Sequence, residues 1–370
     1  MSCRPRPSAR RIAAALCALG WAVLATGTSP VRADVLPEPL DRPALMTPRA
    51  SSAVLLGLAR AGTRMLAVGE RGIVLVSNDE GGSWQQVAVP TSVTLTAASF
   101  VTPDDGWAIG HSGIVLATAD GGRTWTRRLD GKRAARIAME AAQAAHGDDK
   151  RAADVSRVAQ RLVDDGADKP FLDLHFVDAR HGIVIGAYGL IFGTDDGGRT
   201  WTSWLDRLEN PKGLHLNALA VSGESIVIAG EQGLLLRSGD GGKSFARLGS
   251  PYEGSWFAAS YLPGGRLLVA GLRGNVFFSD DAGASFTRAE MTLRDTVGSL
   301  CVLADGSVLA LNQGGQVQVS RDQGRSFHPL AMPAGPLPIR LAQSSSGRVL
   351  ASSVRGVQVL PIGLPSRSPQ

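Results

Sequence analysis

The chain has 370 residues, 44% of them hydrophobic, with 45 glycines and a formal net charge of +5. Residues 1–33 hold five arginines and no acidic residue, so the rest of the chain carries 38 − 5 = 33 basic and 33 acidic residues and is formally neutral. Nucleic-acid binding requires a basic surface. The balanced charge after residue 33 supplies no such excess, so we expect no nucleic-acid partner.

The first 33 residues have the organisation of a secretory signal peptide. Four arginines precede an apolar run over 12–25, and Val31 and Ala33 form a small-residue cleavage pattern. The run is shorter than the roughly 20 residues that a spanning helix needs. We therefore expect cleavage after Ala33 and export, with the periplasm as the destination and secretion or a lumen as the alternatives.

Cysteine usage after the signal peptide excludes several kinds of site. Cys3 and Cys17 leave with that segment, so Cys301 is the one cysteine of the remaining chain. A single cysteine excludes an intrachain disulfide and a thiolate metal cluster. Because Cys301 lies in the apolar stretch SLCVLADG, we interpret it as a packing residue, with a reactive thiol as the alternative.

One octapeptide occurs six times along the chain. Its copies are SNDEGGSW (77–84), TADGGRTW (118–125), TDDGGRTW (194–201), SGDGGKSF (238–245), SDDAGASF (279–286) and SRDQGRSF (320–327). The aspartates are spaced by 41, 76, 44, 41 and 41 residues, so one unit is about 41 residues long. A fixed period of this length indicates a repeat architecture.

Each copy follows two apolar runs that are separated by a Gly-x-x-Gly turn, as in GWAIGHSGIVLAT. Another apolar segment lies further upstream in each unit, and residues 348–360 repeat the two runs without an octapeptide. Seven units of about four short strands predict an all-β, seven-bladed β-propeller.

The octapeptide is predicted to be the turn between the third and fourth strands of a blade. Its hydroxyl and carboxylate side chains can bond to the backbone of the turn, its second glycine permits a positive φ, and its last residue is expected to pack between blades. Six copies of one aspartate cannot all be catalytic, so we interpret the motif as architecture. Its residues are Asp79, Asp120, Asp196, Asp240, Asp281 and Asp322, with Trp84, Trp125, Trp201, Phe245, Phe286 and Phe327.

Residues 131–169 interrupt the repeat between the second and third units. The segment is rich in alanine and in other helix-favouring residues. We expect two helices over 132–145 and 150–164. Two interpretations remain open: a solvated helical hairpin on the edge of a blade, or an element that binds a partner or gates access to the ring.

The seventh unit lacks a fourth strand, because the chain ends soon after it. We expect residues 34–48 to supply that strand and to remove the exposed sheet edge. The propeller then spans 34–363 as a single domain, followed by a disordered tail over 364–370.

Antiparallel strands place the octapeptides on one face of the propeller and the Gly-x-x-Gly turns, with the insertion, on the other. The residues inside the Gly-x-x-Gly turns vary between units while the glycines recur, which is the pattern of a scaffold with a tailored surface. Hairpin tips that tolerate any polar residue are the alternative explanation. The candidate partner-binding residues are Arg71, His111, Tyr188, Arg273 and Arg355, and the arginines suit carboxylate groups of a peptide.

The octapeptides are Asp-boxes, also called BNR repeats. The form DGGxTW after GWAIGxxGxIxxT resembles the photosystem II assembly and stability factor family of seven-bladed propellers, over nearly all of residues 50–360. The resemblance implies an exported, non-enzymatic scaffold for photosynthesis-related assembly. Such a scaffold holds a membrane-protein or envelope-complex subunit without a cofactor, and the resemblance leaves peripheral membrane association open.

The alternative function is that of an Asp-box glycoside hydrolase or sialidase. The chain lacks the usual RIP motif of sialidases and has only three tyrosines, Tyr188, Tyr252 and Tyr261. A carboxylate pair contributed by two different blades is left open. His175 and His181 are interpreted as polar surface residues, so we expect no metal site.

Overall fold

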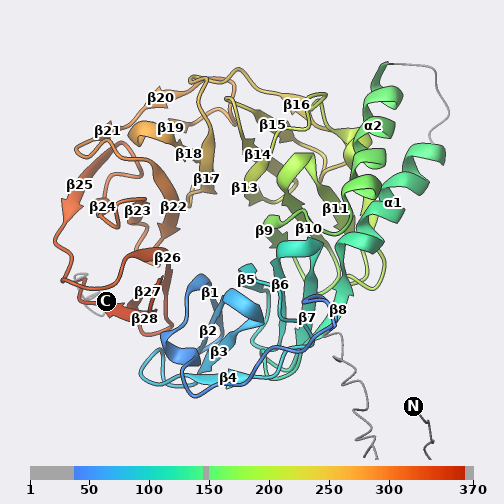
Figure 1. Cartoon of the computed structure of the whole chain (residues 1–370). Helices are drawn as coiled ribbons and strands as arrows, with labels where there is room; N and C mark the ends of the chain where they lie inside the picture. The colour runs from blue at the N-terminus through green and yellow to red at the C-terminus, as the bar shows by residue number, and fades with distance from the viewer. Residues whose placement is uncertain (1–36, 145–149, 363–370) are drawn as a thin grey trace, which may run out of the picture. The chain divides into compact units, whose positions relative to one another are not determined.

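The computed structural model describes residues 37–144 and 150–362, and within the unit Pro37–Gln370 they form seven sheets around a ring (Figure 1). The predicted seven-bladed β-propeller is confirmed. The expected signal peptide over 1–33 and the expected tail over 364–370 lie outside the described residues. Within the described ranges, none of the helices combines the length and the hydropathy needed to cross a membrane.

The first four blades each contain four strands, numbered from the inside of the ring outward. Blade one has β1 (Leu55–Ala61), β2 (Arg64–Gly69), β3 (Val74–Ser77) and β4 (Gln85–Val87). Blade two has β5 (Leu95–Phe100), β6 (Asp105–Gly110), β7 (Val115–Ala119) and β8 (Thr126–Leu129). Blade three has β9 (Phe171–Phe176), β10 (Gly182–Gly186), β11 (Ile191–Thr194) and β12 (Thr202–Ser203). Blade four has β13 (Leu216–Ser222), β14 (Ser225–Gly230), β15 (Leu235–Ser238) and β16 (Ala246–Arg247).

Blade five also has four strands, whereas blade six has five and blade seven has three. Blade five has β17 (Trp256–Tyr261), β18 (Leu267–Gly271), β19 (Val276–Ser279) and β20 (Thr287–Arg288). Blade six has β22 (Val297–Val302), β23 (Val308–Asn312), β24 (Val317–Ser320), β25 (Ser326–Leu330) and an added outer strand, β21 (Glu290–Met291), which runs parallel to β25. Blade seven has β26 (Pro338–Gln343), β27 (Val349–Ser353) and β28 (Gly356–Leu360).

The second strand of a blade is buried on both faces because neighbouring blades cover it, whereas outer strands such as β16 and β20 are exposed. β2, β14 and β18 are almost entirely buried, so they are continuous apolar runs without an alternating pattern. Aromatic side chains fill the interface between blades two and three. Trp107 stacks on Phe176 with ring centroids 3.6 Å apart, and Phe176 meets Trp201 edge-on at 6.4 Å.

The Asp-box turns share one hydrogen-bond arrangement. In blade two, Asp120 Oδ1 accepts the backbone N–H of Thr124 at 2.9 Å, and Oδ2 accepts the Thr124 hydroxyl at 2.6 Å. The Thr118 hydroxyl donates to Asp120 Oδ1 and accepts the N–H of Gly122. The same bonds recur around the other five aspartates, so each carboxylate is occupied within its own turn.

Two consecutive residues of each box have positive φ. The first of the pair is glycine in three boxes but Glu80, Ala282 and Gln323 in the others, whereas the second is glycine in all six. At Gly242, φ is 86° and an added Cβ would lie 2.5 Å from the Trp204 ring. The second position therefore requires glycine both for its backbone conformation and for the space available.

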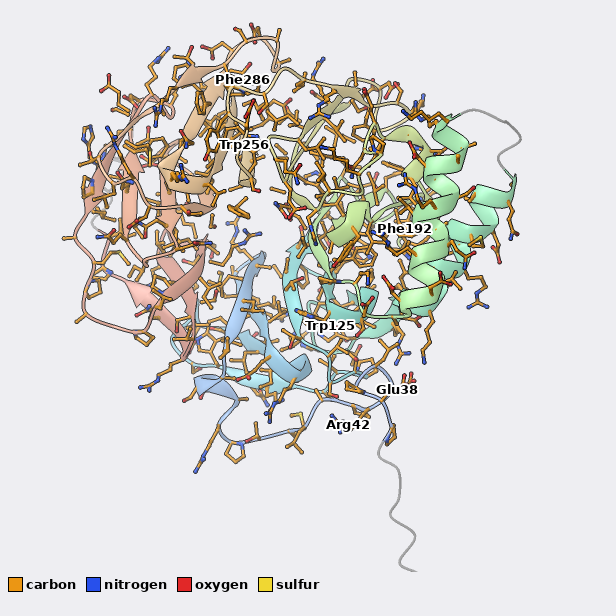
Figure 2. The ribbon with its side chains drawn as sticks, turned by 45° about the horizontal axis from the view of Figure 1, so that its top comes forward. Glu38, Arg42, Trp125, Phe192, Trp256 and Phe286 are labelled. Carbon is orange, nitrogen blue, oxygen red and sulfur yellow. The ribbon has the colours of Figure 1, made fainter. Side chains whose placement is uncertain are left out.

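The N-terminal segment does not close the ring as expected. Instead of pairing with blade seven, it runs along the outside of blades one and two, where Figure 2 shows Glu38 and Arg42. The backbone N–H of Ala44 donates to Val89, and the buried side chains of Leu40 and Ala44 pack with Val89 and Val93. Because Leu40 and Ala44 are buried against Val89 and Val93, the N-terminal segment lies on blades one and two and not on blade seven.

Blade seven closes the ring with three strands. Leu350 of β27 packs into a cluster with Leu55, Met65 and Leu75 of blade one. The N–H of Gly356, at the start of β28, donates to Ala53 at 2.8 Å, next to the short 3-10 helix η1 (Ala50–Ser52). Side-chain packing between the first and last blades therefore joins the two ends of the propeller.

The predicted helical insertion between blades two and three is confirmed. Its helices are α1 (Gly131–Ala144) and α2 (Lys150–Asp165), each ending within one residue of the expected bounds. They lie outside blade three in Figure 1, where α1 packs against β12 and against η3 (His111–Gly113), and α2 packs against η5 (Leu205–Arg207). Buried alanines on α1 and Val155, Ala159 and Leu162 on α2 join the core cluster of blade three.

Candidate functional site

The Gly-x-x-Gly turns are pinned to the start of the inner strand of their own blade. In each of the seven turns, the residue after the first position donates its N–H to the carbonyl just before that strand, for example Glu70 to Val54 at 3.0 Å and Ala187 to Pro170 at 3.1 Å. Where the first position is glycine, an added Cβ would lie 2.1–2.3 Å from that carbonyl oxygen. The glycines recur because the backbones approach this closely.

The variable residues of these turns project from the ring in a strained conformation. Five of the seven turns hold a non-glycine residue at φ between 51° and 58°: Arg71, Ser112, Tyr188, Gln232 and Arg273. Side chains at this position are presented at the tip of a fixed turn. A left-handed conformation in a non-glycine residue is costly and is often found at functional positions.

The structure distributes the candidate partner-binding residues over five blades. Arg71, His111, Arg273 and Arg355 are exposed at the turns of blades one, two, five and seven. Tyr188, in η4 (Ala187–Gly189) of blade three, is 38% exposed and is surrounded by polar side chains from neighbouring elements. Tyr188 is therefore the candidate residue whose side-chain contacts we describe in detail.

Tyr188 lies between a lysine and a histidine that the sequence analysis did not select. Lys169 Nζ is 4.7 Å from the centroid of the Tyr188 ring, and the His215 ring is 4.8 Å from it. Burial lowers the pKa of Lys169, but hydrogen bonds to Asp168 and Asp165 outweigh it and raise that pKa above its ordinary value. Lys169 therefore stays protonated and holds its cation over the ring.

His215 is fixed from its other side by Glu231. His215 Nδ1 lies 2.6 Å from Glu231 Oε2, which also accepts the backbone N–H of His215 at 2.8 Å. Burial raises the pKa of Glu231, but these hydrogen bonds outweigh it and leave the pKa below its ordinary value. The ionised carboxylate orients the imidazole against Tyr188.

A cavity of about 260 Å³ opens beside Tyr188, between α2 and the linker that joins blades three and four. Its apolar walls come from Val155 and Val158 of α2, Leu205 and Leu208 near η5, and Pro211. A concave apolar site with a few polar groups at its edge is the usual form of a binding pocket.

The linker that forms one wall of this cavity is held in place by side-chain hydrogen bonds. Asn210 Oδ1 accepts the N–H of Leu214 at 3.0 Å, and Asn210 Nδ2 donates to the Leu214 carbonyl at 2.9 Å. Arg157 of α2 donates to the Pro211 carbonyl at 3.1 Å and also pairs with Asp154. The Asn210 bonds fix the conformation of the linker, and the Arg157–Pro211 bond connects the insertion to it.

Carboxylates inside the ring have structural partners. Asp173 of β9 accepts the N–H of Leu219 on blade four at 2.8 Å and that of Leu174 at 2.9 Å, so both of its oxygens are bonded to backbone. Burial raises the pKa of Asp173. His181 is exposed and pairs with Asp178, whereas His175 lies half-buried on β9 and is not the surface residue that the sequence predicts; burial lowers its pKa. Among the described residues, no group of three or more His, Cys, Asp or Glu side chains could hold a metal ion.

Two irregularities of the repeat meet at the cavity, and the sequence signals both. One is the insertion; the other is the spacing of 44 residues between Asp196 and Asp240, three more than the usual 41. In the structure, twelve residues (204–215) separate β12 from β13, whereas seven (88–94) separate β4 from β5. The extra length carries the apolar wall of the cavity, but its place beside α2 depends on the fold.

The sequence of this chain is similar to one known protein family and to a curated protein. The model of a family described as photosynthesis system II assembly factor YCF48 matches residues 76–145 and 153–253. A photosystem II assembly lipoprotein Ycf48 from Synechococcus sp. (strain CC9902) is 36% identical over 88 residues, which are 22% of this chain and 26% of that protein. The chain thus spans about a quarter of the length of this curated relative, and its similarity to the photosystem II assembly factor family is confirmed.

Solved structures show the same fold at low sequence identity. A structure of YCF48 bound to D1 peptide has a TM-score of 0.57 and 16% identity and covers 86% of this chain and 98% of that one. YCF48 from Cyanidioschyzon merolae gives 0.61 and 15%, with 85% and 97% covered. The WD40 propeller domain of Doa1 gives 0.59 and 10%, with 87% and 96% covered.

Proposed function

We propose, with similarity to the photosystem II assembly factor family as the premise, that this chain is an exported, non-enzymatic assembly factor. It holds a segment of a membrane-protein subunit against the face that carries the Gly-x-x-Gly turns and the α1–α2 hairpin. The family match over residues 76–145 and 153–253 is the observation that carries this proposal. The structure of YCF48 bound to D1 peptide supports a peptide as the bound group.

The chemistry of the two faces favours the turn-bearing one. On the opposite face the Asp-box carboxylates are occupied by their own turns, as at Asp120. The turn-bearing face offers exposed arginines on rigid tips, such as Arg71 and Arg273, and the aromatic ring of Tyr188. Arginine and tyrosine are enriched among the residues that contribute most to protein–protein binding.

Site-specific photocrosslinking in the native envelope tests this proposal. A benzoylphenylalanine at Tyr188 or at Arg273 is expected to capture an integral membrane-protein subunit, identified by mass spectrometry. The same probe at Lys243, which is exposed on the Asp-box face, is the matched control and is expected to capture none. Capture from Lys243 alone would show that the partner binds the Asp-box face and would overturn the proposed binding face.

Two further measurements address the partner and the enzyme alternative. Binding of a synthetic D1 peptide to the purified chain asks whether the client resembles that of YCF48. Incubation with sialoside and β-glucan substrates is expected to give no turnover. Hydrolysis of either substrate would overturn the scaffold proposal in favour of a glycoside hydrolase.

A further inference from the structure

The cavity beside Tyr188 has a smaller neighbour, and the two share one apolar edge. The second hollow, of about 70 Å³, is lined by Arg157, Arg161 and Lys212 and by the residues common to both, Val158, Tyr188, Pro211 and Gly213. Together they form a short groove between α2 and the 204–215 linker. We call it the α2–linker groove.

Positive charge dominates the edge of this groove. Its lining includes the cations Lys150, Arg151, Arg157, Arg161 and Lys212, against the carboxylates Asp154 and Glu209. Asp154 is already paired with Arg157. Four cations therefore face one unpaired carboxylate, and the charge of the edge is complementary to an acidic ligand.

We propose that the α2–linker groove binds an acidic peptide segment of the partner by taking one bulky apolar side chain into the 260 Å³ cavity. This inference rests on the proposed function and adds the anchor and its charge. The apolar walls provide the burial that an anchor residue requires. The surrounding cations pair with carboxylates on either side of the anchor.

A peptide fits the shape of this site better than a membrane surface does. Interfacial membrane binding needs apolar side chains that protrude into the lipid, whereas Val155, Leu205 and Leu208 are buried in the walls of a hollow. The cavity has the volume of about nine water molecules at ~30 Å³ each. That space suits one large side chain.

Fluorescence anisotropy on the full chain tests the inference with defined peptides. The probe is labelled Glu-Asp-Glu-Phe-Glu-Asp, compared with the same peptide carrying alanine for phenylalanine and with one carrying lysine for every acidic residue. Each replacement is expected to weaken binding about tenfold or more, and 0.5 M salt is expected to weaken the acidic probe. Equal affinity of the alanine peptide would overturn the anchor.

Variants of the protein provide the second half of the test. Val158→Phe narrows the cavity, and the double variant Arg151→Glu/Lys212→Glu reverses exposed charge without touching the core; each is expected to weaken the probe about tenfold. Lys243→Glu on the opposite face is the control and should bind as the unaltered chain does. If both groove variants bind normally, or if Lys243→Glu weakens binding equally, the assignment is wrong.

Two other arms separate this inference from the alternatives. If phosphatidylglycerol vesicles bind the chain through Arg151 and Lys212 and the acidic peptide does not bind, the ligand of the groove is a lipid surface and the peptide proposal is wrong. Crosslinking from Arg273 in the envelope reports the proposed function independently, because Arg273 does not line the groove. If the crosslinker still captures a membrane-protein subunit but no peptide binds the chain, the groove proposal is wrong and the proposed function stands. If crosslinkers at none of the turn positions capture a subunit, the proposed function is wrong.

Discussion

Replacing Asp120 by alanine should lower stability without affecting partner binding. The carboxylate accepts the backbone N–H groups of Arg123 and Thr124, both at 2.9 Å, and the hydroxyl groups of Thr118 and Thr124. Alanine removes both acceptor oxygens and with them all four hydrogen bonds. The turn between β7 and β8 then loses the side chain that determines its conformation.

The expected loss in the free energy of unfolding is about 1–2 kcal/mol. Arg123 and Thr124 are exposed, so their freed N–H groups can bond to water and each lost bond costs only its modest net value. The Thr118 hydroxyl keeps its bond from Gly122. Asp120→Asn retains one acceptor oxygen for the backbone and should lose about half as much.

The same variants have a predictable pH dependence. Burial raises the pKa of Asp120, but the hydrogen bonds from Thr124, Thr118 and Arg123 outweigh it and lower the pKa to about 2. A carboxyl with a depressed folded-state pKa contributes stability that is present above its unfolded pKa and is lost as pH falls through the folded value. The difference between the unaltered chain and Asp120→Ala should therefore shrink between about pH 4 and pH 2.

Urea denaturation followed by tryptophan fluorescence measures these differences, with Asp104→Ala in the same blade as an exposed control. Binding of the acidic peptide probe is measured on the same samples. A variant of Asp120 that stays as stable as the control but loses the peptide would refute the structural role. It would also move recognition to the Asp-box face.

Three further outcomes follow from the geometry. Gly242→Ala should lower the free energy of unfolding by about 3 kcal/mol or more, because φ is 86° and the added Cβ would lie 2.5 Å from the Trp204 ring. Gly241→Ala, which has open space around it, should lower it by about 1 kcal/mol, and equal urea midpoints of the two variants would contradict this. All six Asp-box carboxylates have lowered pKa values, so acid titration of the whole chain should show stability falling below about pH 4, and a flat profile down to pH 2 would disagree. Burial raises the pKa of the Cys301 thiol to about 11, so iodoacetamide at pH 8 should label it in urea and leave it unmodified in the folded chain; mass spectrometry decides.

The repeat could be predicted from the sequence because each unit satisfies its own local requirements. An Asp-box needs a hydroxyl residue two positions before the aspartate and another four positions after it, and the bonds between Thr118, Asp120 and Thr124 show why. The helices of the insertion were predictable for the same reason, since their composition is a local property. Local hydrogen bonds and local propensities can be read in order along the chain.

Features that depend on distant parts of the chain could not be predicted in this way. The site of the N-terminal segment is decided by where Leu40 and Ala44 find apolar partners, on blades one and two. The parallel pairing of β21 with β25 likewise arises from the path of a linker around blade six. In both cases the position depends on contacts with residues that are distant in the sequence.

The helical insertion and the 204–215 linker are the two places where the chain departs from the repeat around blade three. The same backbone hydrogen bond pins all seven turns, and five of them hold a non-glycine residue at positive φ at the tip. The insertion between blades two and three and the lengthened linker between blades three and four together form the walls of the 260 Å³ cavity. A partner anchored in the α2–linker groove would be held in a single register around the ring. We therefore expect the irregular segment to determine the register in which the proposed partner binds.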